Sequence, residues 1–419
     1  MKRVEFGFGI AAFLFAGPLG AAPAPMVSDV AVSQDADTHV VTVDYALAGV
    51  ARAIVTLDVL TNGVSVGGAA LAHAAGDVNC IVPSGTRRLF WCPDETFPNQ
   101  SFSDGALSVI VQAWTLDDPP PYFVVSLVSQ TNGLFYASAE SIPLGVTNDL
   151  YKTDFLVMRR IPAKGIVWRM GLSGSSDAPW HRVRLSRDYY MGVYEFTQQQ
   201  WVNFYGSNLS SDTTNANWRT RPAETLATYH TVRVLRGDVS DEGSPANTHA
   251  NFSASGTAQL QKLRDLTGVA FDLPTEAEWE FAARAGCGDD LPCESSRLGD
   301  FAWHKANADG RTWPVGLKEP NAWGLYDVCG NVAEAVIDWG TKAYGLDASV
   351  LADADAVQDD PPGGAKNNIG RCYRGGSYED LEKCSLGARG ARNVSSPWVG
   401  FRAWCPADFT GFGEQVQLD

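Results

Sequence analysis

Residues 324–339 read GLYDVCGNVAEAVIDW, and this stretch decides how the chain folds. Gly324 and Gly330 flank a turn of mixed polarity, and the apolar run that follows could enter a core. Asp327 and Asn331 can bond to nearby backbone groups, which favours an irregular loop over a helix or a strand. Burying such a loop is costly unless its carbonyls are satisfied. The stretch therefore predicts a loop held by a cation or by a dense hydrogen-bond network.

The composition limits the class of protein. A chain of 419 residues has room for two domains. Its formal charge of −16 argues against a nucleic-acid partner, because phosphates would be repelled. Thirteen tryptophans and 19% charged residues are typical of a globular chain rather than a disordered one.

The N-terminus predicts a secretory signal peptide over residues 1–24. Lys2 and Arg3 precede an apolar stretch from Phe6 to Phe15, and small residues place the cleavage site within residues 20–25. The alternative is a buried first strand. No later stretch reaches the ~20 apolar residues of a membrane span. We therefore expect a secreted or periplasmic protein without a membrane span.

Eight cysteines in an exported chain predict disulfides. Cys80 and Cys92 could staple a hairpin that turns at Pro83-Ser84-Gly85. Cys287 and Cys293 are separated by five residues in a loop. Four others, whose pairing stays open, are Cys329, Cys372, Cys384 and Cys405. Among these, Cys372–Cys384 is the first pair to test, and zinc is not expected because no Cys-x-x-Cys occurs.

Residues 27–146 show the pattern of an all-β, sandwich-like domain. Apolar and polar residues alternate from Val41 to Tyr45 and from Val55 to Val59. Hairpin turns are predicted at Thr61-Asn62-Gly63 and at Thr131-Asn132-Gly133, the second joining two strands. The domain carries no catalytic set of residues. We interpret it as an accessory or spacer domain, with carbohydrate or surface binding as the alternative.

A linker at about residues 145–152 leads to a second, mixed α+β domain over residues 153–406. Helices are predicted over residues 197–205 and 257–266, the second closed by Gly268. Beyond Gly286 the chain becomes rich in Gly, Asn, Pro and Trp. Such a long irregular stretch in a compact domain usually carries function or a bound metal.

A third helix begins after Thr275 and ends at Gly286. Thr275 caps it, and Glu278 three residues later completes a capping box. Glu276 and Glu278 could also be an acid–base pair, but capping and the helix dipole explain both carboxylates more simply.

Short motifs follow one another in the second domain: YEFTQ (194–198), residues 273–284, PVG (314–316), PNAWGLYD (320–327), GNV (330–332), RGGSY (374–378) and GFR (400–402). In this order they resemble the formylglycine-generating enzyme, or sulfatase-modifying factor, family over about residues 155–406. The resemblance implies a C-type-lectin-like fold that is poor in regular structure and stabilised by calcium. The family includes copper or iron oxidases, periplasmic maturation proteins and members that only bind, so membership leaves the reaction open.

The family's copper centre is not expected here. The oxidase holds Cu(I) with two cysteines after the RGGSY motif. Asp380 stands at the first position, and Cys384 falls one residue before the second. Cys384 and Ser377 remain weak catalytic candidates, and a disulfide is the alternative for Cys384. An iron site of the ergothioneine type is excluded as well, because no two of the six histidines are closer than nineteen residues.

The resemblance also implies a pocket, lined by Arg374, Ser377, Tyr378, Arg389, Trp398 and Arg402. Its arginines could bind a carboxylate, sulfate or phosphate, or Arg374 and Arg402 could be buried structural bridges. Trp398 is the best candidate for stacking on a ligand. Ala333 and Ala335 replace tryptophans that are common in the family, and Asp272 replaces an arginine.

The calcium loop of the family matches Asp327, Val328, Gly330 and Val332. One carboxylate and several backbone carbonyls are oxygen ligands that calcium accepts. The alternative is an Asx-turn in which Asp327 bonds to its own loop.

Together these features predict an exported, non-oxidase member of the family that acts as a binding or accessory module. The alternative is a metal-dependent oxidoreductase of the same family in a periplasmic or extracellular maturation pathway. A peptide, a protein or an anionic small ligand could be the partner. The sequence leaves open whether the protein is an enzyme.

Overall fold

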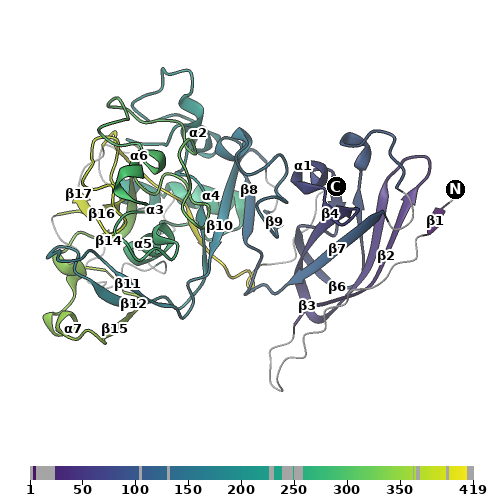
Figure 1. Ribbon diagram of the computed structural model, residues 1–419, viewed down its shortest axis with the longest axis horizontal. Helices are drawn as coiled ribbons and strands as arrows, with labels where there is room; N and C mark the ends of the chain where they lie inside the picture. The colour runs from purple at the N-terminus through teal and green to yellow at the C-terminus, as the bar shows by residue number, and fades with distance from the viewer. Residues whose placement is uncertain are drawn as a thin grey trace. The chain divides into compact units, whose positions relative to one another are not determined.

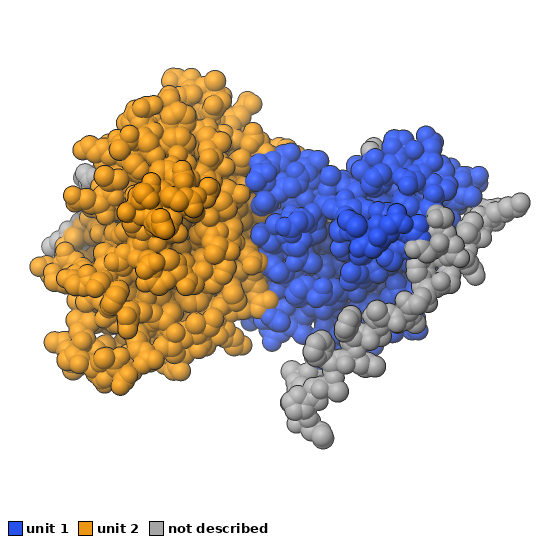
Figure 2. Space-filling model, in the orientation of Figure 1, with its two compact units in different colours: residues 1–124, 131–148, 408–419 blue, residues 125–130, 149–407 orange. Residues whose placement is uncertain are grey.

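The computed structural model describes residues 3–5, 24–102, 106–129, 133–225, 231–237, 249, 258–361, 363–364, 369–392 and 396–412. The predicted signal peptide lies almost entirely outside these residues. The chain forms two compact units (Figure 2). The first comprises residues 1–124, 131–148 and 408–419, and the second comprises residues 125–130 and 149–407. The mixture of helices and strands confirms the predicted α+β class.

The first unit is built on one antiparallel sheet of seven strands (Figure 1). Its central strand, β3 (Val41–Thr61), pairs with β2 (Met26–Asp35), β4 (Val64–Ser65), β6 (Cys80–Trp91) and β7 (Leu107–Trp114). The remaining elements are β1 (Arg3–Glu5), α1 (Gly67–Leu71), β5 (Ala74–Gly76) and η1 (Pro93–Glu95).

A bend in β3 lets both of its halves contribute to one core. The bend contains Gly49, whose φ is +86° and where a Cβ would lie 2.2 Å from the Ala24 carbonyl oxygen. The predicted alternation is confirmed, because Val43 and Tyr45 before the bend and Val55 and Val59 after it are all buried in the same apolar cluster.

The predicted staple between Cys80 and Cys92 is wrong. Residues 80–91 form the single strand β6, which pairs with β3 at Val55 near one end and at Val41 near the other. Pro83 and Gly85 lie inside this strand, opposite the bend of β3, and they do not form a turn. The two cysteines therefore lie at opposite ends of a long strand, whereas a disulfide needs Cα atoms within about 7 Å.

Both hairpin predictions agree with the strand pairing. Asn62 and Gly63, with φ of 50° and 77°, connect β3 to β4 in the left-handed conformation that a tight hairpin requires. β8 (Tyr122–Ser126) pairs antiparallel with β9 (Leu134–Tyr136), while Thr131 and Asn132 of the second turn lie outside the described residues.

The second unit has short strands and helices separated by loops (Figure 1). Its strands are β10 (Phe155–Ile161), β11 (Val167–Met170), β12 (His181–Arg184), β13 (Tyr189–Gly192), β14 (Ala333–Trp339), β15 (Val357–Asp359), β16 (Arg371–Arg374), β17 (Arg389–Arg392), β18 (Val399–Gly400) and β19 (Trp404–Pro406). The strand orders are β19-β13-β10, β11-β12-β15 and β17-β16-β14-β18. In the last of these, β14 lies between β16 and β18, so the opening stretch of the sequence enters the middle of a sheet.

The helical elements of this unit are η2 (Asp149–Lys152), α2 (Gln198–Tyr205), η3 (Trp218–Thr220), α3 (Thr231–Arg236), α4 (Gln259–Thr267), α5 (Glu276–Arg284), η5 (Ser295–Arg297), α6 (Leu298–Phe301), η6 (Lys342–Gly345) and α7 (Ala348–Ala352). The three predicted helices are confirmed as α2, α4 and α5. Gly268 ends α4 in the left-handed conformation, while Thr257 lies outside the described residues. None of the helices in the described ranges is both long and apolar enough to cross a bilayer.

Helix α5 is the centre of the second core, and all nine of its residues are buried. The predicted capping box is present: the Glu278 amide donates to Thr275 Oγ1 at 3.1 Å, and the Thr275 amide donates to Glu278 Oε2 at 2.8 Å. Ala285, one residue before the predicted Gly286, takes the left-handed position that ends the helix. Trp279 packs in the core with Val336 of β14 and Trp404 of β19.

Candidate functional site

The loop at residues 324–332 contains no helix and no strand, as predicted. Asp327, Gly330 and Asn331 have φ values of 54°, 81° and 53°. Residues other than glycine enter this left-handed region only at a cost, so the loop needs contacts that hold it.

A buried carboxylate from another segment supplies these contacts. Glu195 is 0% exposed and lies in the predicted YEFTQ motif. Its Oε1 accepts from the Val332 amide at 2.9 Å, and its Oε2 accepts from Asn331 Nδ2 at 2.7 Å. Asn331 Oδ1 accepts in turn from the Trp313 amide at 2.8 Å. The predicted dense hydrogen-bond network is therefore present, and Glu195 is a site residue that the sequence interpretation missed.

Asp327 has one satisfied and one unsatisfied carboxylate oxygen. Oδ2 accepts from the Gly316 amide at 2.7 Å, whereas Oδ1 is buried without a hydrogen-bond partner. Burial raises the pKa of Asp327 to about 6. Because Asp327 bonds to Gly316 and not to its own loop, the Asx-turn alternative is wrong.

Negative charge accumulates around Asp327. Burial, together with the charges of Asp327 and Glu334, raises the pKa of Glu195 well above its ordinary value. The positive charges of Arg402 and Lys152 act against the rise in the pKa of Asp327, and Arg402 bonds to Glu334. No three His, Cys, Asp or Glu side chains of the described residues converge on one metal position. An unpartnered carboxylate oxygen in an acidic surrounding nevertheless fits a cation whose other ligands are backbone carbonyls.

The segment after RGGSY does not carry an accessible thiol pair. Asp380 accepts from Ser377 Oγ at 3.1 Å. The Cys384 thiol is 0% exposed and donates to the Asp380 carbonyl at 3.5 Å, and burial raises its pKa to about 12. A buried, protonated thiol is a poor nucleophile and a poor metal ligand.

None of the eight cysteines forms a disulfide in the structure. The Cys372–Cys384 pair is not formed, and Cys372 Sγ accepts from Arg389 Nη2 at 3.1 Å. Burial raises the pKa of Cys372 well above its ordinary value.

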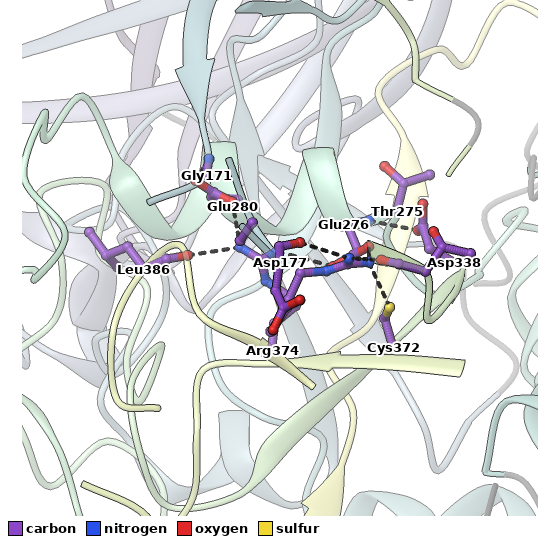
Figure 3. Close-up of polar contacts among 12 residues, drawn as sticks. Gly171, Asp177, Thr275, Glu276, Glu280, Asp338, Cys372, Arg374 and Leu386 are labelled. Atoms are coloured by element: carbon purple, nitrogen blue, oxygen red, sulfur yellow. Dashed lines mark hydrogen bonds and ion pairs between the residues drawn. The ribbon is translucent and has the colours of Figure 1, made fainter. Parts of the chain in front are cut away.

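Arg374 and Arg389 meet on the carboxylate of Glu276. Figure 3 shows Arg374, Glu276 and Glu280 of this network. Arg374 Nη1 donates to Glu276 Oε1 at 3.1 Å, and Arg389 Nε donates to the same oxygen at 2.8 Å. Arg374 also pairs with Glu280 and is 0% exposed. Glu276 is therefore the centre of an ion-pair network and not half of an acid–base pair.

Arg402 belongs to a second buried network. Its Nε donates to Glu334 Oε1 at 3.0 Å, and Trp279 Nε1 donates to Glu334 Oε2 at 2.6 Å. Arg374 lies over the same Trp279 ring at 5.3 Å. Arg374 and Arg402, two of the three arginines predicted to bind a ligand, are therefore buried in ion pairs within the fold. This was the alternative interpretation for them.

The remaining predicted pocket residues do not form one open surface. Ser377 and Tyr378 are buried, and the Tyr378 amide donates to the Asn331 carbonyl at 2.9 Å. Trp398 is half-buried and packs edge-on against Tyr373 with a centroid distance of 5.2 Å. Ala333 and Ala335 are buried in β14.

A histidine between two carboxylates explains the unusual Asp272. His249 lies flat on Trp404, with 3.5 Å between ring centroids. Its Nδ1 is 3.0 Å from Asp272 Oδ2 and its Nε2 is 3.0 Å from Glu278 Oε2. Burial alone would lower the pKa of His249, but Glu278 and Asp272 outweigh it and raise the pKa to about 9. The only sequence signal for this site was an acidic residue where the family has arginine.

The stability of the protein is expected to fall as the pH rises through about 9. The folded pKa of His249 lies above its ordinary value of 6.5, so its contribution is fully present below pH 6.5 and is lost through pH 9. The loss should be roughly 3 kcal/mol in the free energy of unfolding. Urea unfolding across this pH range measures it. In His249→Gln the decline should disappear, and an unchanged decline would contradict the assignment.

Comparison with known proteins covers the same region. Residues 161–405, more than half of the chain, match the family described as sulfatase-modifying factor enzyme 1-like domain. The formylglycine-generating enzyme of Thermomonospora curvata is 35% identical over 156 residues, which cover 32% of this chain and 49% of that enzyme. The chaperone protein LppX of Paenibacillus barcinonensis is 28% identical over 183 residues, covering 36% of this chain and 62% of that protein. The chain thus spans less than two thirds of the length of these curated relatives.

Solved structures give weaker similarity. Treponema denticola variable protein 1 has a TM-score of 0.47 at 25% identity, covering 60% of this chain and 95% of that one. PvdO from Pseudomonas aeruginosa has a TM-score of 0.43 at 23% identity, with 60% and 94% covered. From the extent of the domain match, the chain belongs to the sulfatase-modifying factor family, as its ordered motifs predict.

Proposed function

We propose that this chain is an exported family member that lacks the oxidase centre and acts as a binding or accessory module. The observation that carries the proposal is the segment after RGGSY. Asp380 takes the place of the first copper-binding cysteine, and the Cys384 thiol is buried against backbone carbonyls. A Cu(I) centre built on two thiolates lacks one ligand there, and the other is shielded.

A peptide or protein partner fits this site better than a small anion. Arg374 and Arg402 are 0% exposed and engaged by Glu276, Glu280 and Glu334, so their guanidinium groups do not face a ligand. The half-buried Trp398 is the candidate contact residue, because a tryptophan ring offers a large apolar surface. One relative is named a chaperone protein, which supports an accessory role.

Copper titration with an oxygen electrode tests the proposal. The purified chain should not bind Cu(I) stoichiometrically and should not consume oxygen with thiol peptides. Stoichiometric copper binding with turnover would overturn the proposal and favour the metal-dependent oxidoreductase. A formylglycine-generating enzyme assayed in parallel confirms that the peptides and the copper reagent are competent.

We also propose that calcium stabilises the loop at Asp327. Asp327 Oδ1 and the carbonyls of Val328, Gly330 and Val332 would hold the ion, whose double positive charge would offset the surrounding carboxylates. The support is the buried, unpartnered oxygen of Asp327.

Calcium is therefore expected to raise the free energy of unfolding. At free calcium near 100 times its dissociation constant, the gain over a chelator should be about 2.7 kcal/mol. Urea unfolding in calcium, in magnesium and in chelator measures it, and magnesium should act more weakly because it demands stricter octahedral geometry. Equal stability in calcium and chelator would remove calcium from the proposal.

A further inference from the structure

We propose that Glu195 is the positioning residue of the cation loop, defined as Asp327–Val332, and that it makes this loop selective for a divalent ion. The inference rests on the proposed calcium site and extends it to a residue outside the loop. Glu195 lies 136 positions before Asn331 in the sequence.

Both oxygens of Glu195 bind the cation loop at its most constrained end. One accepts from the Val332 amide and the other from the Asn331 side chain, at 2.9 and 2.7 Å. Gly330 and Asn331 are consecutive left-handed residues, so the chain turns sharply where Glu195 holds it. Without Glu195, the carbonyls of Gly330 and Val332 would lose the contact that fixes their direction.

The Asn331 side chain extends this hold to a third segment. Its Oδ1 accepts from the Trp313 amide at 2.8 Å, and its Nδ2 lies 3.1 Å from the Trp313 carbonyl. The Asn331 amide donates to the Trp303 carbonyl at 2.7 Å. Glu195, Asn331 and Trp313 thus form a relay that fixes the cation loop from both sides.

The charges around the loop point to a divalent ion. Glu195, Asp327 and Glu334 are each at most 2% exposed. Arg402 donates to Glu334 and to the carbonyls of Gly192, Val193 and Tyr326. It therefore pairs with one of the three carboxylates. Within the described residues, Glu195 and Asp327 accept hydrogen bonds from Val332, Asn331 and Gly316 but form no ion pair. In their ionised forms these two carboxylates would be offset by one divalent cation. Hard oxygen donors favour calcium over copper.

Calcium titration of Glu195→Gln in the full-length chain tests the inference. The substitution keeps the size of the side chain but removes its charge and one of its two acceptors. Replacing a residue that orients metal ligands typically weakens affinity by about 10- to 100-fold, and we expect a loss in this range by isothermal titration calorimetry. Glu224→Gln is the matched control, because Glu224 is also buried and accepts from the Ser211 amide at 2.7 Å. The control should bind calcium as the unmodified chain does.

Thermal unfolding separates positioning from a merely structural role. If Glu195 only supports the fold, the variant loses the same stability in calcium and in chelator. If Glu195 positions the loop, the gap between the two melting temperatures shrinks in Glu195→Gln and persists in Glu224→Gln. Unchanged affinity and an unchanged gap would overturn the inference.

The test distinguishes this inference from the calcium proposal beneath it. Failure of the unmodified chain to bind calcium would sink the proposed site itself. If the unmodified chain and Glu195→Gln bind calcium with equal affinity, only the positioning role of Glu195 is contradicted. Should Glu195→Gln not fold, Asn331→Gly removes the side chain that donates to Glu195 in the middle of the relay, adds no charge and tolerates the left-handed backbone. It is expected to weaken calcium binding in the same way, and full affinity there would contradict the inference.

Discussion

Replacing Arg402 by leucine is expected to lower the free energy of unfolding by about 3–5 kcal/mol, the cost of leaving one partner of a buried ion pair alone. Glu334 is 1% exposed, and Arg402 donates to both of its oxygens at 3.0 Å. The same guanidinium also satisfies the carbonyls of Gly192 and Val193 at 3.0 Å. Urea unfolding followed by tryptophan fluorescence measures the loss.

An exposed arginine serves as the control for this prediction. Arg184 pairs with Asp359 at 2.6 Å, but its side chain is 46% exposed. Arg184→Leu should cost at most about 1 kcal/mol, because solvent screens such pairs. The double substitution Arg402→Leu with Glu334→Leu should recover much of the loss, since no charge is then left unpaired. Equal costs for Arg184→Leu and Arg402→Leu would show that burial of the Glu334 pair does not matter.

Gly330→Ala is expected to destabilise the chain by roughly 3 kcal/mol or more. Gly330 has a φ of +81°, and a Cβ there would lie 2.2 Å from the Trp303 carbonyl oxygen and 2.9 Å from its amide nitrogen. These are backbone atoms, so a side-chain rotation cannot relieve the clash. Because the Asn331 amide bonds to the same Trp303 carbonyl at 2.7 Å, the cation loop should shift and calcium affinity should fall with the stability.

Gly268→Ala is the control that measures the cost of a left-handed backbone without the cost of a steric clash. Gly268 has a φ of +70° at the end of α4, but nothing lies within 4 Å of an added Cβ. Its substitution should cost about 1–2 kcal/mol, from the conformation alone. Denaturant unfolding of both variants gives the comparison, and a cost for Gly330→Ala no larger than that for Gly268→Ala would rule out the close approach to Trp303.

Features that depend on a few neighbouring residues were predicted correctly. The capping box of Thr275 and Glu278 spans one helical turn, and the turn at Asn62-Gly63 needs only its own two residues in left-handed conformations. The irregular loop around Asp327 follows from local glycines and polar side chains in the same way. The order of the family motifs was also visible, because each motif is a short run of sequence.

The errors concern residues whose partners are distant in sequence. Pro83-Ser84-Gly85 resembles a turn, but the bend of β3 opposite this segment lets β6 continue as one strand. The arginines suggest an anion pocket, yet Arg374 finds Glu276 and Glu280 from α5 and Arg402 finds Glu334 from β14. A sequence shows that an arginine is present and does not show whether the fold brings a carboxylate to it.

The sequence by itself therefore determined the α+β class, the family and the loop at Asp327, because these rest on periodicity, turn chemistry and ordered local motifs. Tertiary structure alone decided which charges are buried in pairs, that Cys384 is sealed, and that Glu195 holds the cation loop. The physical reason is that burial depends on contacts between segments such as residues 195 and 331, and no local preference encodes such a contact. The role of a buried polar group therefore depends on which residue the fold brings into contact with it.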